Sequence, residues 1–576
     1  MAKLSVDQTN INDLLFTQKL TFLIPDYQRP YEWTEKECTT LWEDIISFAF
    51  PGGDTENFDK KDEYFLGPIV IFPNEKGQRE VIDGQQRLTT ILLLLRAFYD
   101  EFQSQSGTAP FKIREKIARC IWETDEFDDP IKNTLKISSE VATDNDKDEF
   151  LRLLQDGTIT NNMKSTYAVN FRFFQSKIAE YMQQYAHCCF DLPLRILGNC
   201  ILLPIEADSQ ETALRIFSTL NDRGLPLSDS DIFKAKFYKH YSNKGTKNEF
   251  IKEWKELEEK ATDIFHPQKG TPMDELFTKY MYFLRAKTGI KTSTVEGLRN
   301  FYEKNNYERL NDDTFQNLKS LASFWENIVY QNEEIFTKTV LNKFFILNYA
   351  PNNMWSYIVS VYYMQNKNKD GSIDNNKLEA FLDKITAFIF AYTIVRPGVN
   401  SLRAPIFAEM INIVNNKKVT FADYRFAGKA DLRNRFNYYT FSNSRAITKS
   451  ILTWWAFQNP EQKYLKLSDK LEIEHIYAKK RNQLNPLSNS SLLETLGNKS
   501  LLEKTINISV NAYMFNDKKK YYLGNIAGKN ETKICELKDL ANQKRDFKEK
   551  DIKNRTNQII EAFIEYLDKE KLIETL

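Results

Sequence analysis

The stretch EVIDGQQRLTTILLLL, residues 80–95, joins a short β-type run to a leucine-rich helical pattern. The apolar pair at 81–82 is followed by Asp83 and Gly84, which favour a tight turn. The Gln-Gln-Arg triplet at 85–87 then falls in the first turn of the expected helix. Polar side chains beside a buried helix cost desolvation free energy unless they have partners. The stretch therefore predicts a strand–turn–helix unit whose polar turn has a binding partner.

The nature of that partner follows from the chemistry of a helix start. Free N–H groups and the helix dipole favour an anion at this position. Arg87 can add bidentate recognition of a phosphate, and Asp83 can hold a metal or position a water. The alternative is structural: Asp83 caps the helix and Arg87 pairs with a buried carboxylate. That alternative explains Asp83 but leaves the two glutamines without a role.

Composition limits where a nucleic-acid surface can lie. The chain has 576 residues, of which 42% are apolar and 13% aromatic, enough for three or four folding units with sizeable cores. Lys plus Arg equal Asp plus Glu at 79 each. A surface for DNA must therefore come from local clustering of basic residues and not from bulk charge.

The cysteine pattern and the apolar runs predict a soluble, cytoplasmic protein. The six cysteines show neither CxxC nor zinc-knuckle spacing, so free thiols in a reducing compartment are expected. The N-terminus lacks a charged-then-apolar leader. The longest apolar runs fall far short of the roughly 20 residues that cross a bilayer, so no membrane contact is expected.

Periodicity predicts an α+β chain in which helices predominate. Residues 1–110 mix short strands and helices, including strands in YFLGPIVIF and GQREVID. Residues 111–200 are expected to be mostly helical. A buried strand at 201–205 precedes helices, one of them capped by Ser228. Apolar residues at helical spacing fill 246–400. The strand-like LEIEHIY and a polar Asn/Ser loop interrupt the helices that continue to the C-terminus.

The segment IPDYQRPYEW, residues 24–33, combines aromatic residues, a glutamine and an arginine between two prolines. An arginine and aromatic rings on a rigid loop suit stacking on a base or reading a phosphate. The candidate contacts with DNA or with the pocket are Tyr27, Gln28, Arg29 and Tyr31. For Trp33 we expect a place in the core instead.

A second candidate site lies near His475, in KLEIEHIYAKKRN. Glu474 precedes this histidine, and Asn498 and Asn507 follow nine residues apart. A carboxylate and an amide oxygen are hard ligands suited to Mg²⁺, and a neutral imidazole can take the proton of an attacking water. Consecutive strand residues point to opposite faces, so Glu474 and His475 share one site only if the strand bends there.

Basic residues flank the second site and suit contacts with DNA phosphates. They are Lys479, Lys480, Arg481, Lys518, Lys519 and Lys520. Charge runs are also common on solvated surfaces, and that interpretation stays open.

The C-terminal motifs EIEHIYAKKRN, LGNKSLLEKTIN and FNDKKKYY resemble the DUF1524 module, an HNH nuclease. The resemblance implies that His475 is the general base and that Glu474 and Asn507 are the metal ligands. It also implies that Asn498 belongs with His475 to the catalytic residues, where it holds the ββα-metal loop in shape. The chain departs from the family at Ala478, where proline is frequent, and with a lysine after the GN.

The N-terminal motifs IPDYQRPYEW, YFLGPIVI, DGQQRLTT and IFSTLNDRG–LPLSDSDIFKA resemble the DUF262 domain of GmrSD-type restriction enzymes over residues 10–240. The resemblance implies a ParB/sulfiredoxin-like core that binds and hydrolyses a nucleotide. The implied nucleotide-binding residues are Asp83, Gly84, Gln85, Gln86, Arg87, Asn221 and Arg223. The loop at 24–33 is implied to line the same pocket.

DUF262 followed by DUF1524 in one chain resembles the fused GmrSD arrangement, to which the SspE and BrxU types are related. It implies three parts. These are an NTP-binding sensor domain at 1–245 with its ParB-like core at 10–110, a helical linker or bundle at 246–400, and a helical domain bearing the HNH nuclease at 401–576.

The expected function is an NTP-regulated, modification-dependent (type IV-like) DNA endonuclease that restricts phage DNA in a prokaryotic cytoplasm. The expected partners are modified double-stranded DNA, Mg²⁺ or Mn²⁺, and an NTP (GTP, ATP, CTP or UTP). Whether the chain forms a homodimer is left open. Two alternatives remain: an NTP-switched DNA-binding regulator with a degenerate nuclease domain, and a nucleotide-dependent enzyme with no DNA role.

Overall fold

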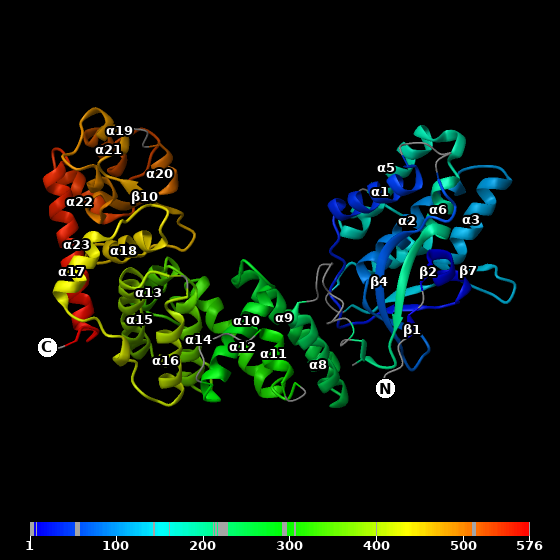
Figure 1. Ribbon diagram of the computed structural model, residues 1–576, viewed down its shortest axis with the longest axis horizontal. Coiled ribbons are helices and arrows are strands. Elements are labelled where there is room, and N and C mark those ends of the chain that lie inside the picture. The colour runs from blue at the N-terminus through cyan, green and yellow to red at the C-terminus, as the bar shows by residue number, and fades with distance from the viewer. Residues whose placement is uncertain are drawn as a thin grey trace. The chain divides into compact units, whose positions relative to one another are not determined.

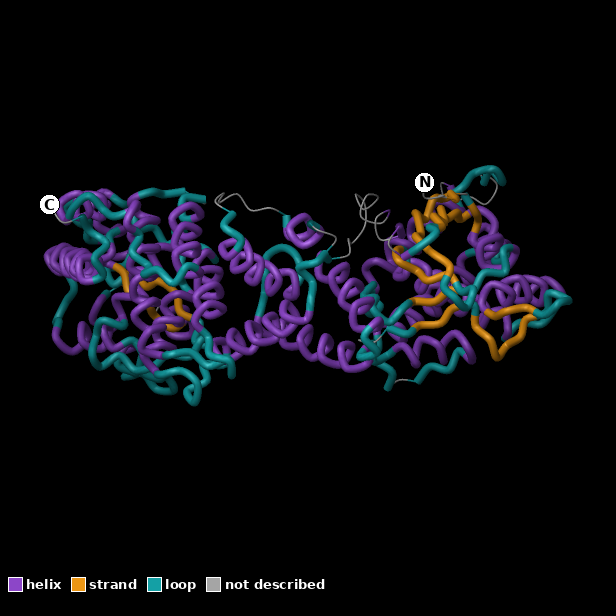
Figure 2. The backbone as a smooth tube through the Cα atoms, turned by 90° about the horizontal axis from the view of Figure 1, so that it is seen from below, coloured by secondary structure: helices purple, strands orange, loops and turns teal. Residues whose placement is uncertain are grey.

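The computed structural model describes most of the chain. The described residues are 5–6, 8–51, 58–141, 144–160, 162–210, 212–213, 216, 228–290, 297–304, 307–398, 400–509 and 514–574. They form two compact units, unit 1 (1–255) and unit 2 (256–576). Helices predominate and strands form small sheets (Figures 1 and 2), which confirms the predicted mostly helical α+β class. The three-part division and the ParB/sulfiredoxin-like core stay predictions.

The larger sheet of unit 1 is mixed, and Asp83 lies at the C-terminal end of one of its interior strands. β5 (Arg79–Asp83) lies between β4 (Tyr64–Pro73), its antiparallel partner, and β3 (Phe22–Ile24), its parallel partner. The β4–β5 turn closes because Asn74 Oδ1 accepts hydrogen bonds from two main-chain N–H groups. The remaining strands are β1 (Ser5–Val6), β2 (Thr9–Asn10), β8 (Ile137–Ser139) and β9 (Cys200–Glu206).

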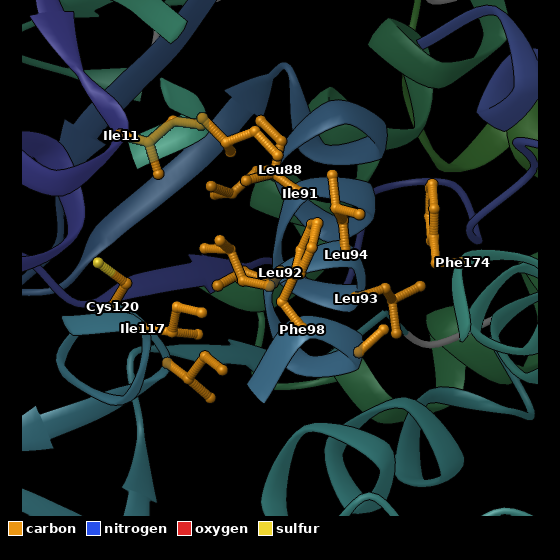
Figure 3. Packing of buried hydrophobic residues seen from close by; sticks show 14 of the residues in the cluster. Ile11, Leu88, Ile91, Leu92, Leu93, Leu94, Phe98, Ile117, Cys120 and Phe174 are labelled. Atoms are coloured by element: carbon orange, nitrogen blue, oxygen red, sulfur yellow. The ribbon is translucent and has the colours of Figure 1, made fainter. Parts of the chain in front are cut away.

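Helix α2 (Gln85–Gln103) follows β5 directly and forms the centre of the unit 1 core. Fifteen of its 19 residues are buried, as expected for a helix that is apolar around its whole circumference. It packs against α3 (Thr108–Ile121) and α5 (Thr166–Gln184). Figure 3 shows Leu92 of α2 surrounded by apolar side chains from several elements. The strand–turn–helix prediction is therefore confirmed.

The prediction that residues 111–200 are mostly helical is wrong for 122–139. β6 (Trp122–Thr124) and β7 (Pro130–Leu135) form a hairpin, and β8 joins the main sheet beside β3. The strand β7 is almost entirely exposed, so it lacks the apolar alternation that signals a strand in a sequence. Pairing in the structure reveals these strands, locally between β6 and β7 and with the distant β3 for β8.

Further helices begin in unit 1, and the last of them, α9, continues across residue 255 into unit 2. They are α1 (Glu35–Ala49), α4 (Lys147–Asp156), α6 (Asp191–Asn199), α8 (Asp229–Asn243) and α9 (Lys247–Ile264), with one π turn at Asp13–Thr17. Ser228 caps α8 as predicted, because its hydroxyl accepts from the Asp231 N–H while the Asp231 carboxylate accepts from the Ser228 N–H.

Unit 2 begins with a run of packed helices, as predicted for 246–400. They are α10 (Pro272–Lys287), α11 (Leu298–Glu303), α12 (Asp312–Val329), α13 (Lys338–Asn348), α14 (Met354–Asn366), α15 (Asn375–Val395) and α16 (Arg403–Val414). Helices α10, α14 and α16 pack on one another. Rings of Phe324, Trp325 and Phe344 fill the space between α12 and α13.

The rest of unit 2 surrounds a two-stranded hairpin, β10 (Leu471–His475) with β11 (Lys499–Glu503). The helices here are α17 (Lys429–Tyr438), α18 (Ala446–Ala456), α19 (Lys479–Leu484), α20 (Lys504–Ser509), α21 (Phe515–Tyr522), α22 (Cys535–Gln543) and α23 (Glu549–Lys569). Helix α20 follows β11 without a loop, and α19 lies between the two strands. The ββα-metal module stays a prediction.

Two further observations concern the cysteines and the apolar segments. The six cysteines are free thiols. Within the described ranges, no helix has both the length and the apolar character that a bilayer span requires.

The packing of α2 makes a stability prediction. Leu92 is completely buried, so Leu92→Ala removes apolar contacts and leaves a cavity. We expect a loss of about 2–5 kcal/mol of unfolding free energy for unit 1. Thermal unfolding of the full chain measures it, with Leu194→Ala, at an exposed leucine, as the control. Equal melting temperatures for the two variants would contradict the assignment of α2 as the core.

Candidate functional site

The loop at 24–33 is held by Gln86, from the first turn of α2. Gln86 Oε1 accepts hydrogen bonds from the main-chain N–H of Glu32 (2.7 Å) and Trp33 (3.2 Å). Its Nε2 donates to the carbonyl oxygen of Pro30 at 2.9 Å. Gln86 is buried. This glutamine therefore satisfies three main-chain groups of a proline-interrupted loop that has no regular structure of its own.

Two more glutamines tie the loop to the sheet and to α2. Gln85 Nε2 donates to the carbonyl oxygen of Arg29 at 3.1 Å. Gln28, also buried, donates to the carbonyl oxygens of Val81 (3.3 Å) and Ile82 (3.1 Å) in β5. Gln28, Gln85 and Gln86, which we expected to contact a ligand, thus bind the protein's own main chain. The loop's shape depends on them.

The tyrosines of the loop point into the interior. The Tyr31 hydroxyl lies 2.7 Å from Thr90 Oγ1 and accepts from Asn170 Nδ2 at 2.9 Å. The Tyr31 ring stacks on Tyr167 with centroids 4.8 Å apart. Tyr27 is buried as well, and burial raises its pKa well above the usual value. Neither ring is presented for stacking on DNA, whereas the expectation that both line a ligand pocket stays a prediction.

Three charged side chains remain at the β5–α2 turn: Asp83, Arg87 and Arg29. All three are only partly exposed. Burial raises the pKa of Asp83, opposed by the Gly84 N–H and by the positive charges of Arg87 and Arg29. Burial lowers the pKa of Arg87, opposed by Asp83. Arg29 also pairs with Glu32, so the two cations at the turn are balanced by two carboxylates, and an anionic ligand would be bound by directed N–H groups and not by an excess of charge.

Gly67 lets the Arg87 guanidinium lie against the backbone of β4. A Cβ at Gly67 would stand 2.9 Å from Arg87 Cζ, and Arg87 Nη1 donates to the carbonyl oxygen of Pro68 at 2.8 Å. Gly84 is the N-cap of α2 in the left-handed region (φ 87°) and supplies no side-chain cap. The first N–H groups of this 19-residue helix therefore lack a capping side chain.

The other face of this turn is acidic. Arg29 pairs with Glu32 at 3.2 Å. Burial raises the pKa of Glu32, Arg29 lowers it, and Asp231 of α8 raises it further. The Asp231 carboxylate therefore lies close enough to Glu32 to raise its pKa. Asn221 and Arg223, also expected at the nucleotide site, lie outside the described residues.

The second candidate site is built on the β10–β11 hairpin. The register pairs Glu474 with Ser500 and His475 with Lys499. β10 continues as a regular strand to His475, its last residue, so Glu474 and His475 point to opposite faces. The bend that would bring both side chains to one face does not occur within β10.

Glu474 is buried and already paired with a cation. Lys518 Nζ of α21 donates to Glu474 Oε1 and to the main-chain oxygen of His475, each at 2.5 Å. The Tyr522 hydroxyl donates to the same carboxylate oxygen at 2.8 Å. Lys518 is only 2% exposed. The expectation that Lys518 contacts DNA phosphates is therefore corrected: its ammonium is turned inward to neutralise Glu474.

Asn507 lies on the same face of the hairpin as Glu474. Its Nδ2 donates to Glu472 Oε2 at 3.0 Å, and Glu472 and Glu474 are two residues apart on β10, hence on one face. Two carboxylates and an amide oxygen are the ligands that Mg²⁺ prefers, with water and substrate phosphate completing its shell. A group of three or more His, Cys, Asp or Glu residues suited to a metal is absent from the described residues.

His475 faces a different set of groups. Its Nε2 lies 3.5 Å from Glu494 Oε1 and, among the described residues, has no hydrogen-bond partner although it is buried. Burial and the Lys499 ammonium lower the pKa of His475 to about 4, against the opposing effect of Glu494. The imidazole is therefore neutral at neutral pH and has a nitrogen available to accept a proton.

Glu494 and Lys499 form the surroundings of His475 that sequence reasoning missed. Lys499 is fully buried, and its Nζ donates to Glu494 Oε2 at 2.6 Å. Burial would raise the pKa of Glu494, but hydrogen bonds from Lys499 and Lys479 lower it to about 2. We had noted Lys499 only as a departure from the family pattern. Its position directly opposite His475 in the hairpin was the missed signal.

Asn498 clamps the chain immediately after His475. Its Oδ1 accepts from the Tyr477 N–H at 2.7 Å, and its Nδ2 donates to the Tyr477 carbonyl at 3.1 Å. It is fully buried. Gly497 next to it is required by space, because a Cβ there would collide with the Ile552 carbonyl and the Thr556 side chain of α23. Asn498 is thus a positioning residue and not a catalytic one.

The remaining basic residues differ in how far their side chains are exposed. Lys479 has a side chain that is 63% exposed and lies 3.1 Å from Glu494 Oε1. Lys480 is exposed. Lys519 Nζ donates to the carbonyl oxygen of Lys544, and Arg481 is buried against Asp546. Lys479 and Lys480 are therefore the lysines best placed to meet a phosphate near His475.

Comparison with known families identifies both ends of the chain. Residues 11–238 match the N-terminal domain of GmrSD restriction endonuclease, and residues 426–562 match the C-terminal domain of GmrSD restriction endonucleases. Both are present in one polypeptide. The chain belongs to the GmrSD restriction endonuclease family. The two matches cover the strand–turn–helix unit of α2 and the His475 hairpin, so both candidate sites lie in GmrSD domains.

A curated relative is Uncharacterized protein MJ0686 of Methanocaldococcus jannaschii, which is 25% identical over 352 residues. The match covers 57% of this chain and 56% of that protein. The chain therefore spans little more than half the length of this relative.

The lowered pKa of His475 predicts that the C-terminal GmrSD domain loses stability in acid. An unfolded histidine has a pKa near 6.5, so between about pH 6.5 and 4 the unfolded chain takes up a proton that the folded site resists. Stability from this group is therefore lost as the pH falls through that window, by at most about 3 kcal/mol. His475→Gln removes this effect, and its melting temperature in metal-free buffer should fall less than that of the wild type between pH 7 and 5.

The exposed His187 supplies the control, since His187→Gln should keep the wild-type pH dependence. If His475→Gln also keeps it, the imidazole is not held neutral by the fold.

Proposed function

We propose that this GmrSD chain is a DNA endonuclease that cuts phosphodiester bonds at an HNH site around His475, under the control of a nucleotide site at the β5–α2 turn. The observation that carries the proposal is the buried His475 Nε2, which has no hydrogen-bond partner among the described residues. Its contact with the Glu494 carboxylate, at 3.5 Å, is longer than a hydrogen bond. Buried polar atoms are normally satisfied, so this nitrogen at a strand end suits a water molecule bound for reaction.

His475 acts as the general base in this proposal. Its neutral imidazole accepts the proton of a water that attacks the phosphorus. Glu494 lies 3.5 Å from Nε2 and stabilises the imidazolium as it forms. Lys479, exposed and bonded to the same carboxylate, offers positive charge to the phosphate. Asn498 keeps the chain after His475 in place.

The hard oxygen donors fit a single divalent cation, Mg²⁺ or Mn²⁺. Glu474 and Asn507 would hold it, and Glu472 lies within hydrogen-bond distance of Asn507. When bound, the cation would stabilise the negative charge of the leaving oxygen. Because Lys518 already neutralises Glu474, that ammonium must give way for the carboxylate to bind a metal.

The nucleotide site lies at the uncapped start of α2. The helix N–H groups and the side chains of Arg87 and Arg29 would bind the phosphates of an NTP, and Asp83 would bind an accompanying cation or a water. Because the glutamines of the same turn fix the loop at 24–33, phosphate binding at the turn is directly linked to the position of that loop.

The biological role that fits this pair of sites is restriction of foreign DNA. In this proposal the N-terminal domain senses nucleotide state and modified phage DNA in a prokaryotic cytoplasm, and the C-terminal domain cuts. The substrate is double-stranded DNA, and the NTP is GTP, ATP, CTP or UTP.

The cleavage proposal is tested with His475→Ala. Loss of the general base should lower Mg²⁺-dependent cleavage of plasmid and phage DNA by about 10²–10⁴-fold. Cleavage is measured on modified and unmodified DNA, with His187→Ala as the matched histidine control. Wild-type cleavage by His475→Ala would move the catalytic site elsewhere.

The nucleotide proposal is tested with Arg87→Ala. Loss of charge-assisted hydrogen bonds to a phosphate should weaken NTP binding roughly 10- to 100-fold, and NTP hydrolysis should fall in parallel. Binding of the four NTPs is measured by calorimetry.

The matched control is Arg152→Ala, since Arg152 is exposed on α4 and distant from the turn in sequence. Unchanged NTP affinity in Arg87→Ala, with normal folding, would overturn the assignment of the pocket.

One observation favours a second candidate function, an NTP-switched DNA-binding protein with an inactive nuclease domain. Lys518 occupies Glu474 as an internal counterion, and in an inactive site no metal would need to replace it. Salt-dependent DNA binding with no cleavage in Mg²⁺ or Mn²⁺, by wild-type protein with bound NTP, would support this candidate over the nuclease.

A further inference from the structure

Unit 2 contains a cavity that belongs to neither candidate site. It has a volume of about 220 Å³, many times the roughly 10–15 Å³ that one water molecule needs. Its walls come from the end of α9, from α10, α12, α13 and α14, and from the segment before β10. The residues that matter here are Phe265, Glu275, Lys279, Trp325, Phe344, Trp355 and Leu467.

Aromatic rings make up much of the wall. Trp325 and Trp355 meet edge to face with centroids 5.5 Å apart, and Phe344 lies 6.5 Å from each. Trp325 is almost fully buried, whereas Trp355 is only partly buried. A partly exposed tryptophan at the rim of an apolar cavity offers a ring face on which a planar ligand can stack.

The floor carries a buried ion pair. Lys279 is 3% exposed, and its Nζ lies 3.0 Å from Glu275 Oε1 and 2.7 Å from Ser356 Oγ. The rings of Trp325 and Tyr357 lie 4.7 and 4.9 Å from the ammonium. Burial lowers the pKa of Lys279, and Glu275 opposes this effect. A buried charge pair is costly, and here it places a donor and an acceptor side by side in an aromatic cavity.

Amide groups stand at the mouth. Asn348 and Asn353 line the cavity and are exposed. A ligand that satisfies this set has a flat π system of one or two rings and an edge with adjacent hydrogen-bond donor and acceptor. Nucleobases have both features, since the edge of each base combines donors and acceptors and every base has a face for stacking.

We propose that this cavity binds a single unpaired nucleobase, stacked on Trp355 with its polar edge toward Glu275 and Lys279. That the base comes from the DNA substrate rests on the proposed nuclease function. A base inside a duplex is covered by stacking and pairing, so DNA must present it from a single strand or a flipped nucleotide. The free nucleoside has the same chemistry and is the other source.

One wall of the cavity is a chain segment that continues directly into β10, the strand that carries His475. Leu467 forms part of its wall, and the main-chain N–H of Leu467 donates to Gln331 Oε1 at 2.9 Å. Gln331 Nε2 also donates to the Leu465 carbonyl oxygen at 3.1 Å. The wall segment leads into β10 four residues later. A base in the cavity would therefore contact the chain just before the hairpin of the proposed nuclease site.

Binding is measured by calorimetry on full-length protein without divalent metal or NTP. The probes are the four deoxynucleosides, a single-stranded oligonucleotide and a fully paired duplex. We expect at least one deoxynucleoside and the single strand to bind, and Trp355→Ala to weaken both about 5- to 150-fold, which corresponds to loss of one stacking contact. Asn348→Trp, a change at an exposed position, should block the mouth without disturbing the core.

The matched controls are Tyr330→Ala and Glu259→Gln, which alter an exposed aromatic ring and an exposed carboxylate outside the cavity. Glu275→Gln should weaken binding where Glu259→Gln does not. Absence of binding by every deoxynucleoside and by the single strand overturns the proposal, as does binding that both Trp355→Ala and Asn348→Trp leave unchanged.

The base-binding proposal and the nuclease proposal can each be wrong without the other. If DNA is cut in a His475-dependent manner while no base binds, the cavity assignment is wrong and the nuclease stands. If bases bind in the cavity but DNA is never cut, the base site stands and the nuclease assignment falls. Binding of deoxynucleosides without binding of the single strand identifies the free nucleoside as the ligand.

Discussion

The side chain of Gln86 is the contact on which the organisation of the N-terminal domain depends. It satisfies three main-chain groups of the loop at 24–33, which has no regular structure of its own to pair them. Because Gln86 lies on the first turn of a buried helix, the loop, the sheet and the helix are joined at one corner. The charged residues Asp83, Arg87 and Arg29 lie at this corner.

In the paired strands β10 and β11 of the C-terminal GmrSD domain, buried charged side chains, in place of amides, satisfy the polar groups. Lys518 and Lys499 are both buried, one on each face, and each neutralises a carboxylate. Breaking one partner of such a pair leaves an uncompensated charge in the interior. The hairpin therefore keeps Glu474 on one face and His475 on the other, and any cation that binds Glu474 must compete with an internal ammonium.

Regular elements with strong local patterns could be predicted from the sequence. The β5–α2 unit, the Ser228 cap, the helices of 246–400 and the strand ending at His475 all carry their signal within a few residues. The β6–β7 hairpin could not be predicted, since its strands are short, polar and stabilised by pairing. The candidate residues were found by motif, but side-chain directions decided their roles: Asn498 clamps a loop, and Gln85 and Gln86 bind the main chain.

Local motifs set the chemical groups and their order along the chain: a polar turn before a buried helix, and an acid–histidine pair followed by two asparagines. Family membership follows from those motifs. Which groups face each other depends on the folding of remote segments onto one another. Strand alternation separated Glu474 from His475, burial turned Lys518 inward, and helices distant in sequence enclosed Lys279 among aromatic rings. Such outcomes depend on desolvation and packing between remote segments, which no local pattern encodes.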